Sequence, residues 1–555
     1  MDADMAIKIN PKMEVRKLQR VAHAHNLAPC GPAPKDTSPL PSSCTIRTSN
    51  GAESPQKPLH HVRLDGRTLE GGGQLVRIAL GLSALTGRAV TVDHVRGNRG
   101  GKTGLKASHA AAVKLLAEIS GSHVSDGNVG SKCLTFTPPQ ACVEEDEQSP
   151  DATRQPQDIP LVSLNTLSVK PEYNIRLTTP GSVFLIFQAL YPYLLHVGLR
   201  AMTECIRVNI VGGTNGTSSP SYDYAAQVMA PNFVRLGLPS FSMTLQSRGW
   251  TSGVVGMGEV SFFIRPLPEL TDGLASEKSK QSVGVGAACA SRFPRIKIMD
   301  YECGKITRIT ITVLAPNDAL QKAKENGSPF TVAEYVEQET LRRLRKSLKT
   351  LDQTILAEPL NGERHIPIDM SPTEFTSHPS RLYILLVAHT STGFRIGHDA
   401  LFGDHRGRKH TKQKVGKHQK YKKGQGPPPK KKDSEAHLQR VSDMIDECVQ
   451  GFIDELSETH DDTQTYQIDG STGSTPAKRS CLDSHMRDQI VVFEALGNLG
   501  DKVGIARSEV AQPPEAERYW TLHTKTAQWV CQKMLQDVAN NSTRTRQFKE
   551  RPNYL

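Results

Sequence analysis

The stretch DGRTLEGGGQLVR, residues 65–77, decides how the start of the folded chain is organised. Its three consecutive glycines allow backbone conformations that other residues avoid. The apolar residues that follow recur at helical spacing as far as Gly87, so a loop is expected to become a helix here. A helix N-terminus preceded by glycine exposes backbone N–H groups and favours anions, which makes this turn a candidate phosphate site. A loop that is merely tight is an equally weighted interpretation.

Two charged side chains belong to the same stretch. Glu70 offers an oxygen ligand of the kind that Mg²⁺ prefers. Arg77 adds a fixed positive charge about two helical turns later. Both residues suit a site for a metal ion and a phosphate group.

The composition indicates a large protein with a polyanionic partner. A length of 555 residues suffices for two or three domains, or for one large domain with insertions. Lys and Arg number 68 against 57 Asp and Glu, so the net charge is +11, part of which comes from one local basic run. The ten cysteines include no CxxC pair, so neither a zinc site nor a redox dithiol is predicted and a reducing, intracellular setting is expected.

No membrane segment is expected. The most apolar stretch, Val183 to Leu199, is interrupted by Gln188, Pro192 and His196, which favours a buried helix over a membrane span. The first residues contain no compact apolar segment, so no secretory signal is predicted.

Hydrophobic periodicity predicts alternating strands and helices from residue 61 onward. Residues 1–60 show little periodicity and are predicted to be a disordered leader. A strand, a helix, a strand, a helix and a strand are then expected, in that order, at His61–Leu64, Gln74–Thr86, Ala89–His94, Leu105–Ile119 and Lys132–Thr137. Such alternation is typical of an α/β unit.

A second unit of similar size is expected between residues 161 and 266, which suggests an internal repeat. It should contain a helix after Pro180-Gly181-Ser182, followed by a strand, a helix and a strand pair at Ile206–Val211, Tyr224–Leu236 and around Gly253–Ile264. A smaller α/β domain is expected at about residues 292–386, with a strand, a helix and a strand at Ile306–Val313, Val332–Leu351 and Leu382–Ala388.

The rest of the chain is divided by two low-complexity segments, 406–432 and 460–478. The pieces between and after them, Ala436–Leu456 and Leu482–Leu535, are predicted to form a split third unit. The first segment carries twelve Lys and Arg and no acidic residue. A solvated loop is the favoured interpretation, and nuclear targeting or attraction to a phosphate backbone are its alternatives.

The loop GNRGGKT, residues 97–103, invites a P-loop interpretation, but only three residues separate its outer glycines where the motif requires four. What remains is a loop whose positive charges can clamp phosphates, at Arg96, Arg99, Lys102 and Lys106, with His109 on the helix that follows. No HExxH or GxSxG motif is present, so hydrolase interpretations lack local support.

One histidine near the C-terminal end, His523, lies at a predicted strand-to-helix junction. A lone histidine in such a place is more often structural than nucleophilic. Imidazole attacks phosphorus when its other nitrogen is held by a partner, so the nucleophilic interpretation stays open. Upstream, Asp488-Gln489 can contact a nucleotide or cap a helix.

Seven segments, in order, resemble the RNA 3'-terminal phosphate cyclase family, as a fungal-type member with low-complexity insertions. They are Glu70–Gln74 with Arg77; Arg96, Arg99, Gly104, Leu105 and His109; Gly181-Ser182 with Gln188; Gly212–Asn215 with Pro220 and Asp223; Thr390–Gly393; Asp488-Gln489; and Leu522-His523-Thr524. The resemblance extends from about residue 61 to residue 535.

The resemblance implies a ligase that uses ATP to close an RNA 3'-phosphate onto the neighbouring 2'-hydroxyl, giving a 2',3'-cyclic phosphodiester, AMP and pyrophosphate. It implies that His523 forms a covalent histidyl-AMP and that AMP then passes to the RNA end. It implies Mg²⁺ or Mn²⁺ held by Glu70, and location in the nucleus. It also implies an ATP pocket formed by Gln188, Pro220, His485, Asp488 and Gln489. A second site, for phosphates or the RNA end, is implied at Arg77, Arg96, Arg99 and His109.

The fold implied by the resemblance is α/β, with three repeated βαβαββ-like units whose helices lie on four-stranded sheets, plus a smaller inserted α/β domain. The expected division begins with a leader (1–60) and a large domain with repeats 1 and 2 (61–291). The inserted domain (292–386), repeat 3 (387–540) and a tail (541–555) follow.

Departures from the family pattern favour the first of two alternatives, and the net charge is what the second explains. Thr103 replaces a proline and the phosphate loop has one extra residue, while His485 stands where an aromatic residue is common. The first alternative is a non-catalytic factor in pre-rRNA processing and small-subunit ribosome biogenesis, with ribosome-biogenesis proteins as partners. Such members lack the residue that matches His523, which is present here. The second, a basic RNA-binding protein without ATP use, accounts for the charge but not for the glycines.

Overall fold

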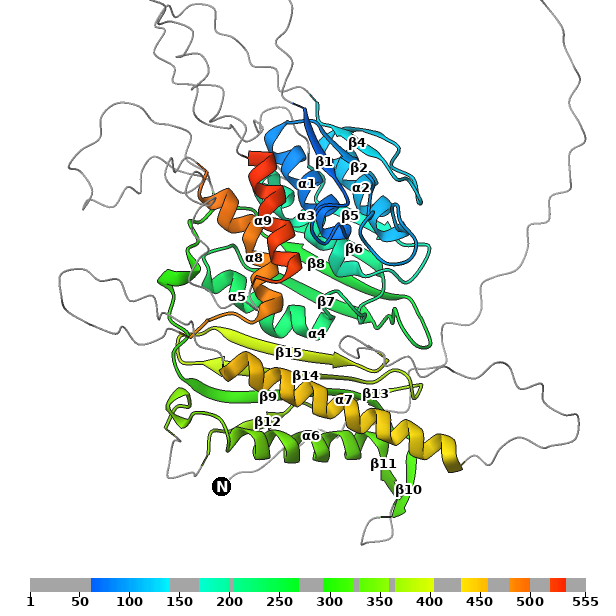
Figure 1. The fold of residues 1–555 in the computed structure, drawn as a ribbon, viewed down its shortest axis with the longest axis vertical. Helices are drawn as coiled ribbons and strands as arrows, with labels where there is room; N and C mark the ends of the chain where they lie inside the picture. The colour runs from blue at the N-terminus through cyan, green and yellow to red at the C-terminus, as the bar shows by residue number, and fades with distance from the viewer. Residues whose placement is uncertain are drawn as a thin grey trace, which may run out of the picture. The chain divides into compact units, whose positions relative to one another are not determined.

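The computed structural model describes residues 61–139, 169–198, 204–268, 293–323, 329–358, 365–403, 431–457, 479–499 and 520–535 (Figure 1). The predicted leader 1–60, the tail 541–555 and the segment 460–478 lie outside the described residues. All but the last two residues of the basic segment 406–432 also lie outside them.

The first repeat is a four-stranded mixed sheet with two helices. Its strands have the spatial order β1 (Val62–Asp65), β2 (Val90–Asp93), β4 (Leu134–Thr137) and β3 (His123–Ser125). β1 and β2 are parallel, and the other two pairings are antiparallel. The helices are α1 (Gly73–Thr86) and α2 (Ala107–Ser120), and each ends at a glycine with positive φ, Gly87 and Gly121, as is common at helix C-termini.

The second repeat has the same topology. The spatial order is β5 (Glu172–Arg176), β6 (Ile206–Gly212), β8 (Gly258–Ile264) and β7 (Phe241–Ser247). The first pair is again parallel and the other two antiparallel. The predicted mixed α/β fold with helices and four-stranded sheets is therefore confirmed.

The helices of the second repeat differ from simple expectation. α3 (Val183–Val197) is buried along almost its whole length, as its apolar sequence predicts. No helix in the described ranges is long and apolar enough to cross a bilayer. The single helix expected at Tyr224–Leu236 is instead α4 (Tyr222–Tyr224), the π-helical turn η3 (Ala225–Met229) and α5 (Ala230–Arg235). The widened turn directly precedes Pro231, whose ring clashes with the backbone of a regular α-helix.

A five-stranded sheet, called the inserted sheet below, follows. Its order is β12 (Ile368–Met370), β9 (Ile306–Pro316), β14 (Tyr383–Thr390) and β15 (Arg395–Leu401), and β13 (Glu374–Thr376) also pairs with β9. Two helices accompany it, α6 (Val332–Leu348) and α7 (Lys431–Ser457), which pack against each other. Smaller elements of this region are η5 (Ile298–Asp300), β10 (Ala319–Ala323), β11 (Pro329–Thr331) and η6 (Gln353–Ile355).

The inserted sheet continues past the domain boundary that the sequence predicted between residues 386 and 387. That boundary falls inside β14, and β14 pairs with β15 from Tyr383 to His389. α7 in turn packs on β15. Backbone pairing, which leaves no compositional signal at a boundary, is what joins these segments.

Two described elements of the predicted third repeat, residues 387–540, belong instead to the inserted sheet and the helices on it, namely β15 and α7. The other described helices of this repeat are α8 (Ser484–Gly497) and α9 (Leu522–Leu535). The two helices pack against each other, and α9 packs along α1 of the first repeat. Figure 1 shows α9, in red, beside α1, and α8, in orange, next to α9. The last described helix is thereby placed next to the first glycine-rich turn.

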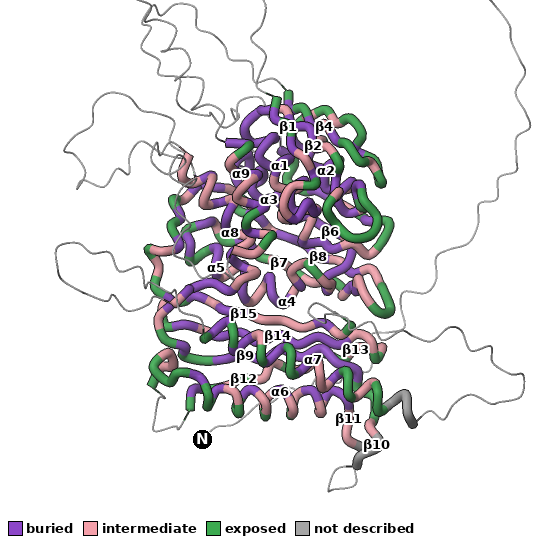
Figure 2. Tube along the Cα trace, viewed as in Figure 1, coloured by how far each residue is buried: buried purple, intermediate pink, exposed green. Residues whose placement is uncertain are grey.

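The buried residues follow the central strands and the helices α1 and α3 (Figure 2). The second repeat has an aromatic core in which Phe187 stacks on Phe262, with ring centroids 4.5 Å apart, and on Tyr191 at 4.7 Å. The first repeat is mainly aliphatic, with residues such as Leu75, Leu82 and Val92 buried.

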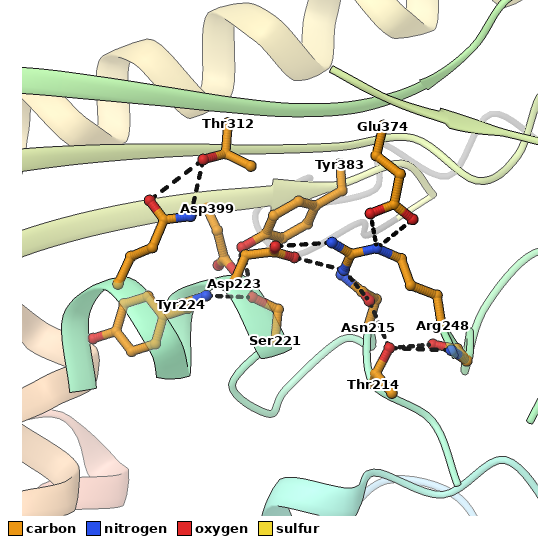
Figure 3. Close-up of polar contacts among 12 residues, drawn as sticks. Thr214, Asn215, Ser221, Asp223, Tyr224, Arg248, Thr312, Glu374, Tyr383 and Asp399 are labelled. Carbon is orange, nitrogen blue, oxygen red and sulfur yellow. Dashed lines mark hydrogen bonds and ion pairs between the residues drawn. The ribbon is translucent and has the colours of Figure 1, made fainter. Parts of the chain in front are cut away.

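The second repeat and the inserted sheet meet along a seam of polar contacts (Figure 3). Arg248 binds Asp223 through two hydrogen bonds of 2.8 and 2.9 Å, and reaches Glu374 of β13 at 2.7 Å. Ser221 is 2.5 Å from the Tyr383 hydroxyl of β14. Because both sides contribute strands or helix ends, the seam fixes the inserted sheet against the second repeat.

Candidate active site

Two strained loops of the first repeat frame the candidate site. In the loop between β1 and α1, Leu69 and Gly71 have φ values of 52° and 58°. In the loop between β2 and α2, His94 and Arg96 have φ values of 47° and 58°. A positive φ is uncommon for residues with a side chain, such as Leu69, His94 and Arg96. Such backbone strain persists where surrounding contacts enforce it, and it clusters at functional sites.

Glu70 lies buried at the centre of the site, with 6% of its surface exposed. Its Oε1 forms an ion pair with Arg99 Nη1 at 3.0 Å. Its Oε2 has no hydrogen-bond partner among the described residues and lies 3.3 Å from Nδ1 of His523. A buried carboxylate oxygen without a hydrogen bond is costly, so this atom is suited to receive a cation.

His523 occupies the first turn of α9, and its side chain is 43% exposed. Its Nδ1 is 3.1 Å from the Gln74 side-chain oxygen, in addition to its approach to Glu70. When Nδ1 carries the proton and donates it to the Gln74 oxygen, Nε2 keeps a free lone pair. The surroundings of His523 therefore favour the tautomer that a nucleophilic imidazole requires.

A half-buried carboxylate, Asp488 of α8, holds the start of α9. It accepts hydrogen bonds from Thr521, at 3.0 Å, and from Thr524, the two threonines that flank His523. Thr521 also accepts from the Thr524 backbone N–H at 3.0 Å and so caps α9. Burial raises the pKa of Asp488, an effect opposed by these hydrogen bonds. These contacts fix the backbone that presents His523.

The N-termini of α1 and α2 are open to an anion. Their N-cap residues, Gly72 and Lys106, make no side-chain capping hydrogen bond. Gly73 allows a close approach here: a Cβ at this position would overlap Nε2 of His109 and lie 3.0 Å from Nη1 of Arg77. Free backbone N–H groups at helix starts attract anions such as phosphates.

The two side chains beside Gly73 differ in charge. Burial lowers the pKa of Arg77 to about 10, so its guanidinium remains charged at neutral pH. Burial, together with the positive charge of Arg77, lowers the pKa of His109 to about 3. His109 is therefore neutral at pH 7 and can donate or accept a hydrogen bond, whereas Arg77 supplies the positive charge.

The predicted phosphate-binding arginines of the second loop point to different places. Arg99 reaches Glu70, as described above. Arg96 is buried and donates to the backbone carbonyls of Lys102, at 2.8 Å, and Gly104, at 3.3 Å. Arg96 therefore stabilises its own loop through backbone carbonyls, and the positive charges of the loop sequence do not reveal these contacts.

Three residues predicted for the nucleotide pocket come together at a cavity of about 50 Å³. Gln188 of α3 donates to the side-chain oxygen of Gln489 at 2.5 Å, and Asp488 also lines the cavity. The same cavity is bordered by Gln74 and Arg77 of α1 and by apolar residues such as Phe187, Tyr191 and Val492.

The other two predicted pocket residues lie elsewhere. His485 lines a larger cavity of about 1130 Å³ that borders α6, α7 and β15, and its ring centroid is 6.3 Å from that of His398. Pro220 is half-buried in the loop before α4, and Gly216 of this loop lines the larger cavity. The two cavities share no lining residue.

The donor set fits a metal ion that arrives with a phosphate ligand. The described residues include no group of three or more His, Cys, Asp or Glu that can hold a metal ion. Among the residues that the structure describes, Glu70 offers the one buried carboxylate oxygen without a hydrogen bond. Mg²⁺ is commonly bound by one or two carboxylates together with substrate phosphates and water. Glu70 therefore matches a shared metal site better than a site made by protein alone.

Sequence reasoning did not assign roles to four residues that the structure places around His523. Gln74 contacts its Nδ1, Thr521 and Thr524 bind Asp488, and Thr526 accepts from the Glu70 backbone N–H at 3.2 Å. The only local signal was the recurrence of threonine on both sides of the histidine.

Comparison with known proteins agrees with this architecture. Residues 68–540 match the family model described as RNA 3'-terminal phosphate cyclase. Proteins named RNA 3'-terminal phosphate cyclase from Koribacter versatilis, Methanosarcina mazei and Drosophila melanogaster are each 31% identical, over 215, 252 and 235 residues. These matches cover 39%, 42% and 42% of this chain and 50%, 61% and 55% of the relatives. The chain thus spans about half the length of the curated relatives it matches.

The fold, the two loops of the first repeat and His523 define an α/β protein built from repeats. Its first and last described helices, α1 and α9, contribute to one polar site. The family match extends over most of the sequence. The chain belongs to the RNA 3'-terminal phosphate cyclase family.

Proposed function

We propose that this protein converts an RNA 3'-terminal phosphate into a 2',3'-cyclic phosphodiester in an ATP-dependent reaction. The observation that carries the proposal is the position of His523, whose Nδ1 lies 3.1 Å from Gln74 and 3.3 Å from Glu70. The relatives named RNA 3'-terminal phosphate cyclase support the same reaction.

The proposed reaction has three steps. Nε2 of His523 attacks the α-phosphorus of ATP, the bond to pyrophosphate breaks, and a covalent histidyl-AMP forms. An oxygen of the RNA 3'-phosphate then takes the AMP group and releases His523. The adjacent 2'-hydroxyl finally attacks the activated phosphorus and loses its proton, and AMP leaves. Adenylylation supplies the leaving group that a phosphate monoester lacks, and the ribose holds the nucleophile close by.

The other residues bind and orient. The open starts of α1 and α2, with Arg77, hold phosphate oxygens, while neutral His109 offers a hydrogen bond at the same place. Gln188, Asp488 and Gln489 border the nucleotide, whereas Pro220 and His485 are left out of this pocket because they lie away from the cavity that the other three residues line. A divalent ion, Mg²⁺ or Mn²⁺, bound by Glu70 would supply charge neutralisation for the phosphates.

An alternative from another class is a non-catalytic factor in pre-rRNA processing and small-subunit ribosome biogenesis, with ribosome-biogenesis proteins as partners. One observation favours it: Arg99 already neutralises the carboxylate that the metal would use. Under either function we propose that the protein acts in the nucleus, on the basis of the Lys- and Arg-rich segment 406–432.

The deciding experiment incubates the folded protein with α-labelled ATP and Mg²⁺, then denatures it and looks for acid-labile label. We expect label on the wild type and on His123→Ala, which changes an exposed histidine of β3, and none on His523→Ala. Release of the label by RNA with a 3'-phosphate, with formation of a cyclic end, completes the assignment. An unlabelled wild type that is folded and supplied with this RNA would favour the non-catalytic alternative.

A further inference from the structure

The N-terminus of α8 is held by a carboxylate with no exposed surface, Asp483. Its Oδ1 accepts from the Met486 backbone N–H at 2.8 Å, which is an ordinary N-cap contact, and from the Tyr224 hydroxyl of the second repeat at 2.6 Å. Its Oδ2 accepts from the backbone N–H of Gly397 in β15 at 2.9 Å. One buried side chain therefore joins α8, the second repeat and the inserted sheet.

A second buried carboxylate reaches the same helix end from the inserted sheet's own helix. Glu455 of α7 accepts from the Ser484 backbone N–H at 3.1 Å and from the Ser484 hydroxyl at 2.7 Å. Both carboxylates are more than nine-tenths buried and lie at the positive end of α8. A cap requires only one oxygen, so the additional contacts to β15 and α7 do more than end the helix.

The partners of Asp483 are themselves fixed. Figure 3 shows Tyr224 at the start of the helix that also carries Ser221 and Asp223, whose contacts form the seam with the inserted sheet. Gly397 lies in the middle of β15, where β14 pairs with it through Val387. Asp483 is thus attached to two rigid supports and not to a free loop.

The next turn of α8 carries the polar residues of the candidate active site. Asp488 accepts from the two threonines around His523, and Gln489 accepts from Gln188. A shift in the first turn of α8 therefore moves Asp488 and, with it, the start of α9. Misplacement by about 1 Å is enough to reduce a reaction rate about a hundredfold.

We infer that Asp483 and Glu455 are positioning residues for nucleotidyl transfer, through which the inserted sheet sets the place of α8 and hence of His523. This inference rests on the proposed function for its effect on the reaction. Its effect on the helices is independent of that function. The inserted sheet on this account is part of the machinery that aligns the site, although it acts through α8 and α9 and not through the contacts of His523 with Gln74 and Glu70.

The test compares Asp483→Asn, Glu455→Gln and Tyr224→Phe with Glu339→Gln. Glu339 is a matched control because it is a carboxylate of α6 that pairs with Arg342 and Arg343 of the same helix. Amide hydrogen exchange is measured on residues 484–497, 520–535 and 306–316 without nucleotide. Formation of acid-labile AMP is measured on the same proteins over a range of ATP concentrations.

We expect exchange in residues 484–497 and 520–535 to rise about tenfold in Asp483→Asn, since a buried hydrogen bond is lost, with 306–316 unchanged. The rate constant for AMP transfer should fall about a hundredfold with a smaller change in KM for ATP. Tyr224→Phe keeps two of the three hydrogen bonds and should give a smaller effect, while Glu339→Gln should resemble the wild type.

Two results would overturn the inference. One is unchanged exchange in 520–535 and unchanged AMP transfer in both carboxylate variants. The other is exchange that rises equally in 306–316, because that pattern reports general loss of stability. If Asp483→Asn does not fold, Glu455→Gln and Tyr224→Phe decide by the same criteria. If the wild type forms no AMP adduct, the proposed function fails while the exchange data still decide the positioning.

Discussion

The two four-stranded repeats share strand order and direction but differ at the starts of their helices. In the first repeat, α1 and α2 begin after Gly72 and Lys106, which provide no side-chain cap. In the second, α3 begins after Ser182, whose hydroxyl accepts from the Phe184 N–H at 3.2 Å, and α4 after Ser221, which accepts from the Tyr224 N–H at 3.0 Å. The same topology thus has open helix ends in one repeat and closed ends in the other.

The difference in helix capping distinguishes a repeat that can bind a ligand from a repeat that supports the inserted sheet. Open N–H groups leave the first repeat able to bind an anion next to His523. In the second repeat the equivalent ends are satisfied, and the loops around them hold Arg248, which binds Asp223 of the same repeat and Glu374 of the inserted sheet. A duplicated unit can therefore lose its ligand contacts and keep its fold, because capping and ion pairing replace the ligand.

The largest expected effect comes from breaking the brace. Asp223→Ala leaves Arg248, which is 11% exposed, with only the partly exposed Glu374 as an ionic partner. We expect a loss of about 3 kcal/mol in the free energy of unfolding, measured by urea denaturation. Glu374→Ala should cost less than about 1 kcal/mol because that carboxylate is half-exposed. Equal losses in the two variants would mean that Asp223 is not the main partner.

The next effect concerns pH and the first repeat. The folded pKa of His109 is about 3, below its ordinary value of 6.5, so the unfolded chain binds a proton below pH 6.5 while the folded protein does not. Stability should fall as pH decreases from 6.5 toward 3, by about 1.4 kcal/mol per unit and thus about 2 kcal/mol at pH 5.

The measurement for His109 is urea denaturation at pH 7 and pH 5, with His109→Gln for comparison. The variant should lose less stability between the two pH values because glutamine does not titrate. Parallel pH profiles of wild type and variant would contradict the prediction. His123→Gln, which changes an exposed histidine, is a suitable control.

A smaller effect tests the closed helix ends directly. Ser182→Ala removes the acceptor at the start of α3 and should lower the free energy of unfolding by about 1 kcal/mol. Lys106→Ala at the start of α2 removes no cap and should change it by less than half of that amount. Thermal or urea unfolding distinguishes the two, and a larger loss for Lys106→Ala would remove the contrast between the repeats.

The smallest effect converts an open end into a closed one. The backbone of Lys106 is extended, with φ −80° and ψ 163°, as an N-cap requires. Lys106→Ser should therefore stabilise the protein by about 0.5 kcal/mol. It should also weaken the stabilisation that inorganic pyrophosphate gives, because the new hydroxyl competes for the same N–H groups and a positive charge is lost. Unchanged pyrophosphate stabilisation would argue against an anion site at α2.

Local sequence patterns predicted the regular elements well. The helix expected at Gln74–Thr86 is α1 (Gly73–Thr86), and the strand expected at Ile206–Val211 is β6 (Ile206–Gly212), because apolar periodicity and glycine punctuation act locally. The short strand β3 (His123–Ser125) was not predicted, since its three residues carry no period. The π turn before Pro231 was missed because the apolar pattern continues through it.

The contacts of the candidate active site were harder to predict from local sequence patterns. Glu70 and Thr526 are 456 residues apart in sequence, and only the resemblance to a family linked the glycine-rich turn with His523. The side chain of Arg96 donates to a backbone carbonyl of its own loop, and because every loop has such carbonyls the sequence did not predict this contact. The contact between Asp483 and β15 pairs a side chain with a backbone N–H, for which no sequence pattern exists.

The attachment of α9 to the first repeat also bears on synthesis. At its far end, Arg88 donates to the Met534 carbonyl at 2.6 Å, so α9 is fastened to α1 at both ends. A ribosome completes the first repeat long before it completes α9, and the side of α1 that α9 will cover waits exposed for most of translation. Until its last described helix docks, the nascent chain therefore exposes this side of α1, and such exposed surface favours association with other chains.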